Sequence, residues 1–85
     1  MDSFTYRTSG VCSRSIDITI DGDTIASVEY HGGCHGNTQG VAALVKGMKV
    51  EDAIERLSGI RCGYKSTSCP DQLAQALTQY LQNNH

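Results

Sequence analysis

The stretch RSIDITIDGDTIASVEY, residues 14–30, carries the clearest structural pattern in this chain. Its first half alternates three isoleucines with polar residues, which is typical of a strand with one buried face: Ile16, Ile18 and Ile20. The Asp-Gly-Asp sequence at 21–23 is a turn signal. The second half alternates again and places on one face Ala26, Val28 and Tyr30. The stretch therefore predicts a β-hairpin.

The segments on either side of the hairpin complete the predicted fold. Residues 4–8 alternate in the same way and predict a further strand of an antiparallel sheet. Downstream, apolar residues recur with helical spacing in three segments: 41–48, 50–57 and 70–81. Asn37 or Thr38 is the expected N-cap of the first helix, and Gly47 and Gly59 are expected to end the first two. Strands followed by helices predict an α+β domain, a three-stranded sheet with three helices on one face.

The size and charge of the chain exclude several classes of protein. It has 85 residues, enough for one domain with a small core. Its net charge is −2 and its basic residues form no run, which argues against nucleic-acid binding. The first residues carry no signal peptide and no apolar run is long enough to span a membrane. We therefore expect a cytoplasmic protein that contacts neither nucleic acid nor a membrane.

Four cysteines, Cys12, Cys34, Cys62 and Cys69, lie at the boundaries of the predicted elements. In a cytoplasmic protein such residues more often bind metal or act as redox thiols than form disulfides. Cys34 and Cys69 each stand at the start of a helix, where the positive end of the helix dipole favours a thiolate. None of the spacings is the close C-x2-C pair of zinc ribbons. A metal site, a dithiol redox pair and four buried thiols all remain open.

The three histidines and Asp71 are further candidates for the same site. His35 follows Cys34 and is a candidate ligand or a donor to the sulfur. His31 ends a strand and is expected at the surface, and the terminal His85 is expected in solvent. Asp71 follows Pro70 in the first turn of the last helix, where it can cap the helix, its commoner role, or accept a hydrogen bond near the site.

Residues 67–71 read TSCPD, and with GGCHGNTQGVAALVKG at 32–47 and all four cysteines the chain resembles small four-cysteine members of the TSCPD domain family. That family is known mainly as a C-terminal part of ribonucleotide reductases. The resemblance implies a link to deoxyribonucleotide synthesis and a reductase as a partner. Reductase catalysis requires a large barrel, so we expect no enzyme activity from residues 1–85 alone; any enzyme label would be ribonucleoside-diphosphate reductase by family association.

The segment around Cys34 is also similar to U-type iron–sulfur assembly scaffolds, which carry a three-stranded sheet, helices on one face and three ligand cysteines. Cys12, Cys34 and Cys69 match those ligands. The scaffolds have aspartate where this chain has Arg14 and histidine where it has Ser68. Cys62 has no counterpart there and supplies a fourth thiolate, which suits structural zinc.

These observations predict a single metal-binding domain with one Zn²⁺ on Cys12, Cys34, Cys62 and Cys69. The zinc would join strand ends to helix starts and stabilise a small core. An iron–sulfur carrier or scaffold is the first alternative. A thiol redox partner of a reductase, using Cys62 and Cys69, is the second.

Overall fold

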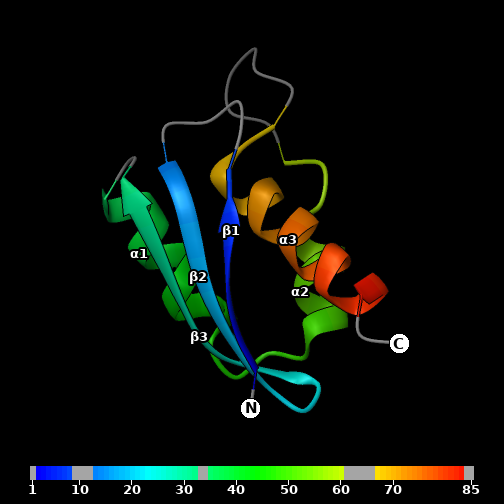
Figure 1. Ribbon diagram of the computed structural model, residues 1–85. Helices are drawn as coiled ribbons and strands as arrows, with labels where there is room; N and C mark the ends of the chain where they lie inside the picture. Colours follow the sequence, from blue (N-terminus) through cyan, green and yellow to red (C-terminus); the bar gives the residue numbers. More distant parts are fainter. Residues whose placement is uncertain (1, 9–12, 33–34, 61–66, 84–85) are drawn as a thin grey trace.

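A three-stranded antiparallel sheet comes first along the chain and three helices follow it (Figure 1). The computed structural model describes residues 2–8, 13–32, 35–60 and 67–83. In chain order the elements are β1 Asp2–Arg7, β2 Ser13–Asp21, β3 Thr24–Gly32, α1 His35–Val45, α2 Val50–Leu57 and α3 Cys69–Asn83. This order confirms the predicted α+β class.

Strand β2 is the centre of the sheet and pairs with both of its neighbours. The hairpin between β2 and β3 turns through two residues, because Asp21 pairs directly with Thr24. Gly22 opens this turn with φ +65°, a left-handed conformation that glycine adopts at little cost. The hairpin predicted from residues 14–30 is confirmed.

One face of the sheet packs against the helices and forms the core. The isoleucines of β2 are almost fully buried there, with Ile18 only 1% exposed. They belong to one cluster with residues of β3 and of all three helices: Ile25, Val45, Val50, Ala53, Leu73, Ala76 and Leu77. The opposite, outer face of the sheet carries the polar residues that alternate with these isoleucines.

The predicted inner face of β3 is correct at Val28 and Tyr30, which pack against the core, but the prediction misses Ile25. The register places Ile20 opposite Ile25 but Thr19 opposite Ser27, so that Ala26 is an extra residue on this strand. Such a β-bulge changes the phase of the alternation. Ile25 is consequently buried in the core on the same face as the apolar residues that follow Ala26, although simple alternation had assigned it to the other face.

Helix α1 was predicted correctly in kind but not in detail. It begins at His35, so Asn37 and Thr38 lie inside its first turn and are not its N-cap. The helical spacing over residues 41–48 predicts that Leu44 is buried, yet it is 78% exposed, whereas the adjacent Val45 is 2% exposed. The helix packs on β3, and this contact buries Val45 and leaves Leu44 in solvent.

The connection between α1 and α2 forms backbone hydrogen bonds with the start of β3. The Gly47 amide donates to the Ile25 carbonyl, and the Ile25 amide donates to the Met48 carbonyl, both at 2.8 Å. Gly47 has φ +90°, as expected for a glycine that ends a helix. These bonds fix α1 and α2 beside the sheet, so the core does not depend on apolar contact alone.

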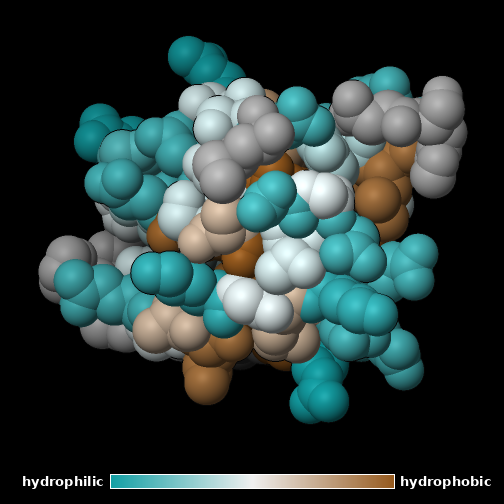
Figure 2. Space-filling model, turned by 90° about the horizontal axis from the view of Figure 1, so that it is seen from below, coloured by the Kyte–Doolittle hydropathy of each residue, from teal (hydrophilic) through white to brown (hydrophobic). Residues whose placement is uncertain are grey.

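Figure 2 shows the surface of the molecule from below. This surface is mostly hydrophilic, and its hydrophobic residues are scattered among polar ones. In the part of the chain that the structure describes, no helix combines the length and apolar character needed to cross a membrane.

Candidate functional site

The elements that flank the cysteines meet at one end of the sheet, at the top of Figure 1, where β1 and β3 end and β2 and α3 begin. Ser13, which directly follows Cys12 in the sequence, pairs with Gly32, which lies two residues before Cys34. The Thr8 hydroxyl donates to the Ser13 carbonyl and holds the end of β1 against the start of β2.

Cys69 is a free thiol at this end of the sheet. It is the first residue of α3 and only 8% exposed. Its Sγ lies 3.3 Å from the Ser13 Oγ, so the thiol of α3 contacts the first residue of β2. The Tyr30 hydroxyl donates to the Cys69 carbonyl at 2.8 Å. Burial raises the pKa of Tyr30, and a negative charge on Cys69 raises it further, so this phenol stays a donor.

The other predicted ligands, Cys12, Cys34 and Cys62, lie outside the described residues, as does His85. The side chain of His35 is also outside the description, although its backbone begins α1. Convergence of the four thiols therefore stays a prediction. The described geometry bears on it through Cys69 and through the sequence neighbours of Cys12 and Cys34.

Ser68 caps α3 and thereby places Cys69 in the first turn. The Ser68 carbonyl accepts the first helical hydrogen bond from the Gln72 amide at 2.8 Å, and its Oγ accepts from the Asp71 amide at 3.1 Å. The Ser68 hydroxyl also donates to the Ile60 carbonyl at 2.6 Å. One serine therefore satisfies the free amides of the helix and joins its start to the segment after α2.

Asp71 joins the same two segments from inside the protein. Its carboxylate accepts from the Gly59 amide at 2.7 Å, from the Gln75 side chain at 2.9 Å and from the Thr67 hydroxyl. Burial raises the pKa of Asp71, but the three donors together outweigh burial and hold this pKa below its ordinary value. The predicted capping role of Asp71 is therefore wrong: Ser68 caps α3, and the Asp71 carboxylate links α3 to the end of α2.

We expect Asp71→Asn to lower the free energy of unfolding by about 1–3 kcal/mol, because an amide cannot accept from all three donors. Urea denaturation at neutral pH measures the change. Asp21→Asn, at an exposed turn position, is the matched control and should stay within about 0.5 kcal/mol of the parent. Equal effects of the two changes would contradict the role assigned to Asp71.

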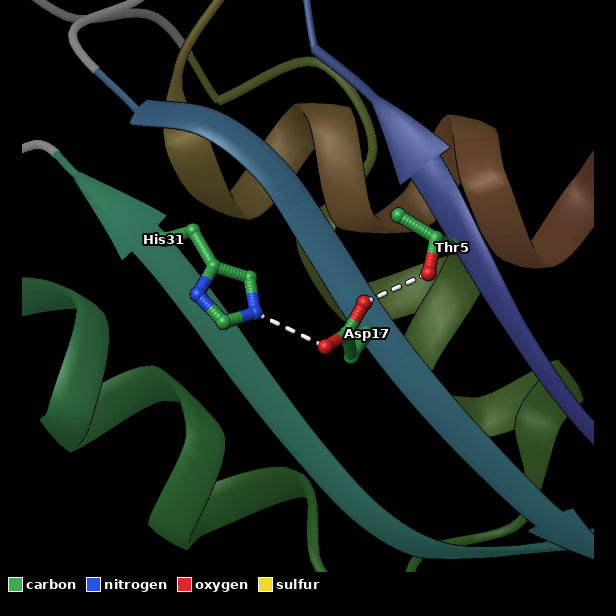
Figure 3. Close-up of polar contacts among 3 residues, drawn as sticks. All are labelled: Thr5, Asp17 and His31. Carbon is green, nitrogen blue, oxygen red and sulfur yellow. Dashed lines mark hydrogen bonds and ion pairs between the residues drawn. The ribbon is translucent and has the colours of Figure 1, made fainter.

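A second polar cluster lies on the outer face of the sheet, between β2 and β3. His31 Nε2 is 2.7 Å from Asp17 Oδ2, and the Thr5 hydroxyl donates to Asp17 Oδ1 at 2.6 Å (Figure 3). The hydrogen bonds from Thr5 and His31 lower the pKa of Asp17, and the hydrogen bond to Asp17 raises the pKa of His31. His31 is at the surface, as predicted, but it is paired there.

The Asp17–His31 pair predicts a pH dependence of stability. The raised pKa of His31 means that its contribution is complete below about pH 6.5 and is lost as pH rises through the folded-state value. The lowered pKa of Asp17 means that its contribution is complete above about pH 3.8 and is lost as pH falls through the folded-state value. The pair is therefore most stabilising between these two values.

We expect the difference in unfolding free energy between the parent and His31→Gln to be larger at pH 5.5 than at pH 8.5, because the stabilisation from a raised histidine pKa declines as pH rises. Chemical denaturation at both pH values measures it, and the comparison cancels the titration of every other group. A difference that stayed constant with pH would show that the pair contributes no ionic stabilisation.

Each residue of the TSCPD pentapeptide now has a structural role. Thr67 donates to the buried Asp71 carboxylate, Ser68 caps α3, Cys69 is a buried thiol and Pro70 lies in the first turn. The family model of the TSCPD domain matches residues 4–81. This chain belongs to the TSCPD domain family. The match covers every strand and helix of the TSCPD domain described above except the first two residues of β1 and the last two residues of α3. Neither the curated proteins nor the solved structures contain a match to the chain. The similarity to U-type scaffolds therefore stays a prediction.

Sequence reasoning missed the residues that hold Cys69 in place. The hydroxyls of Ser13 and Tyr30 contact Cys69. Thr67 donates to the nearby Asp71 carboxylate, and the Gln72 side chain, only 2% exposed, donates to Thr67 at 3.0 Å. Two of them carried a signal: Ser13 adjoins a cysteine, and Thr67 begins the pentapeptide. Tyr30 and Gln72 carried none, because their partners are set by tertiary packing.

Proposed function

We propose that this TSCPD domain binds one Zn²⁺ through Cys12, Cys34, Cys62 and Cys69 and serves as a small accessory domain. The observation that supports this best is the position of Cys69. Its buried Sγ lies 3.3 Å from the hydroxyl of Ser13, the residue after Cys12. Ser13 in turn pairs with Gly32, close in sequence to Cys34.

The environment of Cys69 fits a metal ligand. A helix start favours the thiolate form, and a hydroxyl at hydrogen-bonding distance from the sulfur can donate to it as an outer-shell group does. Tyr30 donates to the backbone carbonyl of Cys69, and Ser68, which directly precedes Cys69, caps the helix. Zinc bound there supplies no redox chemistry; it cross-links thiolates and so stabilises a fold whose core is small.

Elemental analysis of protein purified without added metal tests the proposal. We expect about one zinc per chain and colourless protein. Brown protein with visible absorption after anaerobic purification would favour the iron–sulfur alternative. Folded protein without metal would overturn the metal site.

The redox alternative requires a thiol pair that a substrate disulfide can reach, and the burial of Cys69 weighs against it. Alkylation of native protein, read by mass at each cysteine, discriminates the two. In a closed site all four cysteines resist labelling until a chelator removes the metal, and then react together. Rapid labelling of Cys62 and Cys69 in metal-loaded protein would support the redox function, and labelling of Cys62 alone would support a three-cysteine site.

The partner we propose is a ribonucleotide reductase, and membership of the TSCPD family supports this proposal. The domain would then contribute to deoxyribonucleotide synthesis by binding the reductase rather than by catalysis. Co-elution of the zinc-loaded domain with a reductase from the same source, in size-exclusion chromatography, tests it. Absence of a complex at micromolar concentrations of both proteins would contradict this proposal.

A further inference from the structure

A separate set of metal-ligating side chains lies on the outer face of the sheet: Asp17, Glu29 and His31. The ligand atoms of these three residues all lie within 4.8 Å of one another. The sheet register brings them together, because Asp17 of β2 pairs directly with Glu29 of β3, and His31 follows two residues later on the same face. Figure 3 shows the His31 ring pointing across the sheet toward Asp17.

The donor set suits a divalent transition metal. One imidazole nitrogen and two carboxylates are common zinc ligands, and the two carboxylates balance the charge of a divalent ion. Thr5 donates to Asp17 Oδ1, so that Oδ2 remains for the metal position that the three residues would share. This arrangement is typical of a ligating carboxylate held by an outer-shell donor. The positive charge of Arg14 also acts on His31 and opposes the binding of a cation.

Proton and metal compete for one place in this cluster. In the metal-free protein His31 Nε2 and Asp17 Oδ2 are 2.7 Å apart, the distance of a hydrogen bond. A bound ion takes the place of the shared proton, which leaves to solvent, and both atoms must then move apart slightly to become ligands. Their side chains are 43% and 46% exposed, so rotamer changes are open to both and water can complete the coordination.

We propose that Asp17, Glu29 and His31 form a second, surface Zn²⁺ site with coordination positions open to solvent. This site uses no cysteine, because its ligands are two carboxylates and an imidazole on the outer face of the sheet. Its solvent-facing positions distinguish it from a closed structural centre, because a closed centre has four protein ligands.

Titration with Zn²⁺ of isotopically labelled full-length protein, followed by NMR of the His31 ring, tests this site. One equivalent of Zn²⁺ is added first and further Zn²⁺ after it, at pH 7.5. We expect a saturable change in the His31 ring signals and in the amide signals of residues 17 and 29. Asp17→Asn and Glu29→Gln should each weaken the affinity by at least about 10-fold. Glu55→Gln, an exposed carboxylate on α2, is the matched control and should leave the titration unchanged.

Two results would overturn the proposal. The first is a His31 ring that does not respond to millimolar Zn²⁺. The second is a Glu29→Gln variant that titrates as the parent does, which would reduce the site to a histidine–aspartate pair. Failure of the cysteine site is seen separately: the first equivalent would then leave the cysteine Cβ signals in their metal-free positions, while the His31 ring still reports on the surface site.

Discussion

Removal of the proposed Zn²⁺ from the domain should abolish its cooperative unfolding transition. Binding to a structural zinc site contributes about 10–16 kcal/mol in small zinc domains. The whole stability of a domain is about 5–15 kcal/mol, so a chain of this size would lose most or all of it with the metal. We expect loss of the thermal transition in the presence of a strong chelator, measured by circular dichroism and calorimetry, and its recovery when Zn²⁺ is returned.

Substitution of one ligand should have the same effect without a chelator. Cys69→Ser and Cys34→Ser each replace a sulfur by a hydroxyl of similar shape, which keeps the packing but removes a thiolate. Both variants should be unfolded or molten at neutral pH. Ser13→Ala is the matched control for Cys69, because it removes the hydroxyl beside the sulfur but no ligand, and it should keep a cooperative transition. A thermal midpoint that barely moved in Cys69→Ser would show that the core alone is sufficient.

Ile18→Ala should destabilise the folded protein by about 2–5 kcal/mol, because it leaves a cavity beneath the central strand. Ile18 is 1% exposed and belongs to the cluster that joins the sheet to all three helices. In a domain of this size the change should lower the thermal midpoint by at least about 8 °C. Urea denaturation of the zinc-loaded protein gives the free energy directly.

Thr19→Ser is the control on the neighbouring position and the opposite face. The serine retains the hydroxyl that lies 3.0 Å from the Ser3 hydroxyl, so the cross-strand contact persists. Its effect should stay within about 0.5 kcal/mol. If both substitutions cost the same, the alternation of buried and solvated residues along β2 would be wrong.

The sequence alone determined the elements and the buried face of the central strand. The alternation of Ile16, Ile18 and Ile20 predicts that strand because side chains of a strand point to opposite faces in turn. Pro70 and the apolar spacing after it predict α3, since proline suits the first turn of a helix and the spacing matches one helical face. Each of these signals lies within a single element, so it can be recognised in the sequence without knowledge of the fold.

Pairing and packing decided the rest. The bulge at Ala26 buries Ile25, and the packing of α1 on β3 exposes Leu44. Alternation and helical spacing cannot predict the burial of these two residues, because it depends on the element that lies opposite. The contacts of Cys69 with Ser13 and Tyr30 join residues separated by 56 and 39 positions in the sequence. A periodic pattern shows which face of an element is apolar, whereas the partner of that face is chosen by the packing of the whole domain.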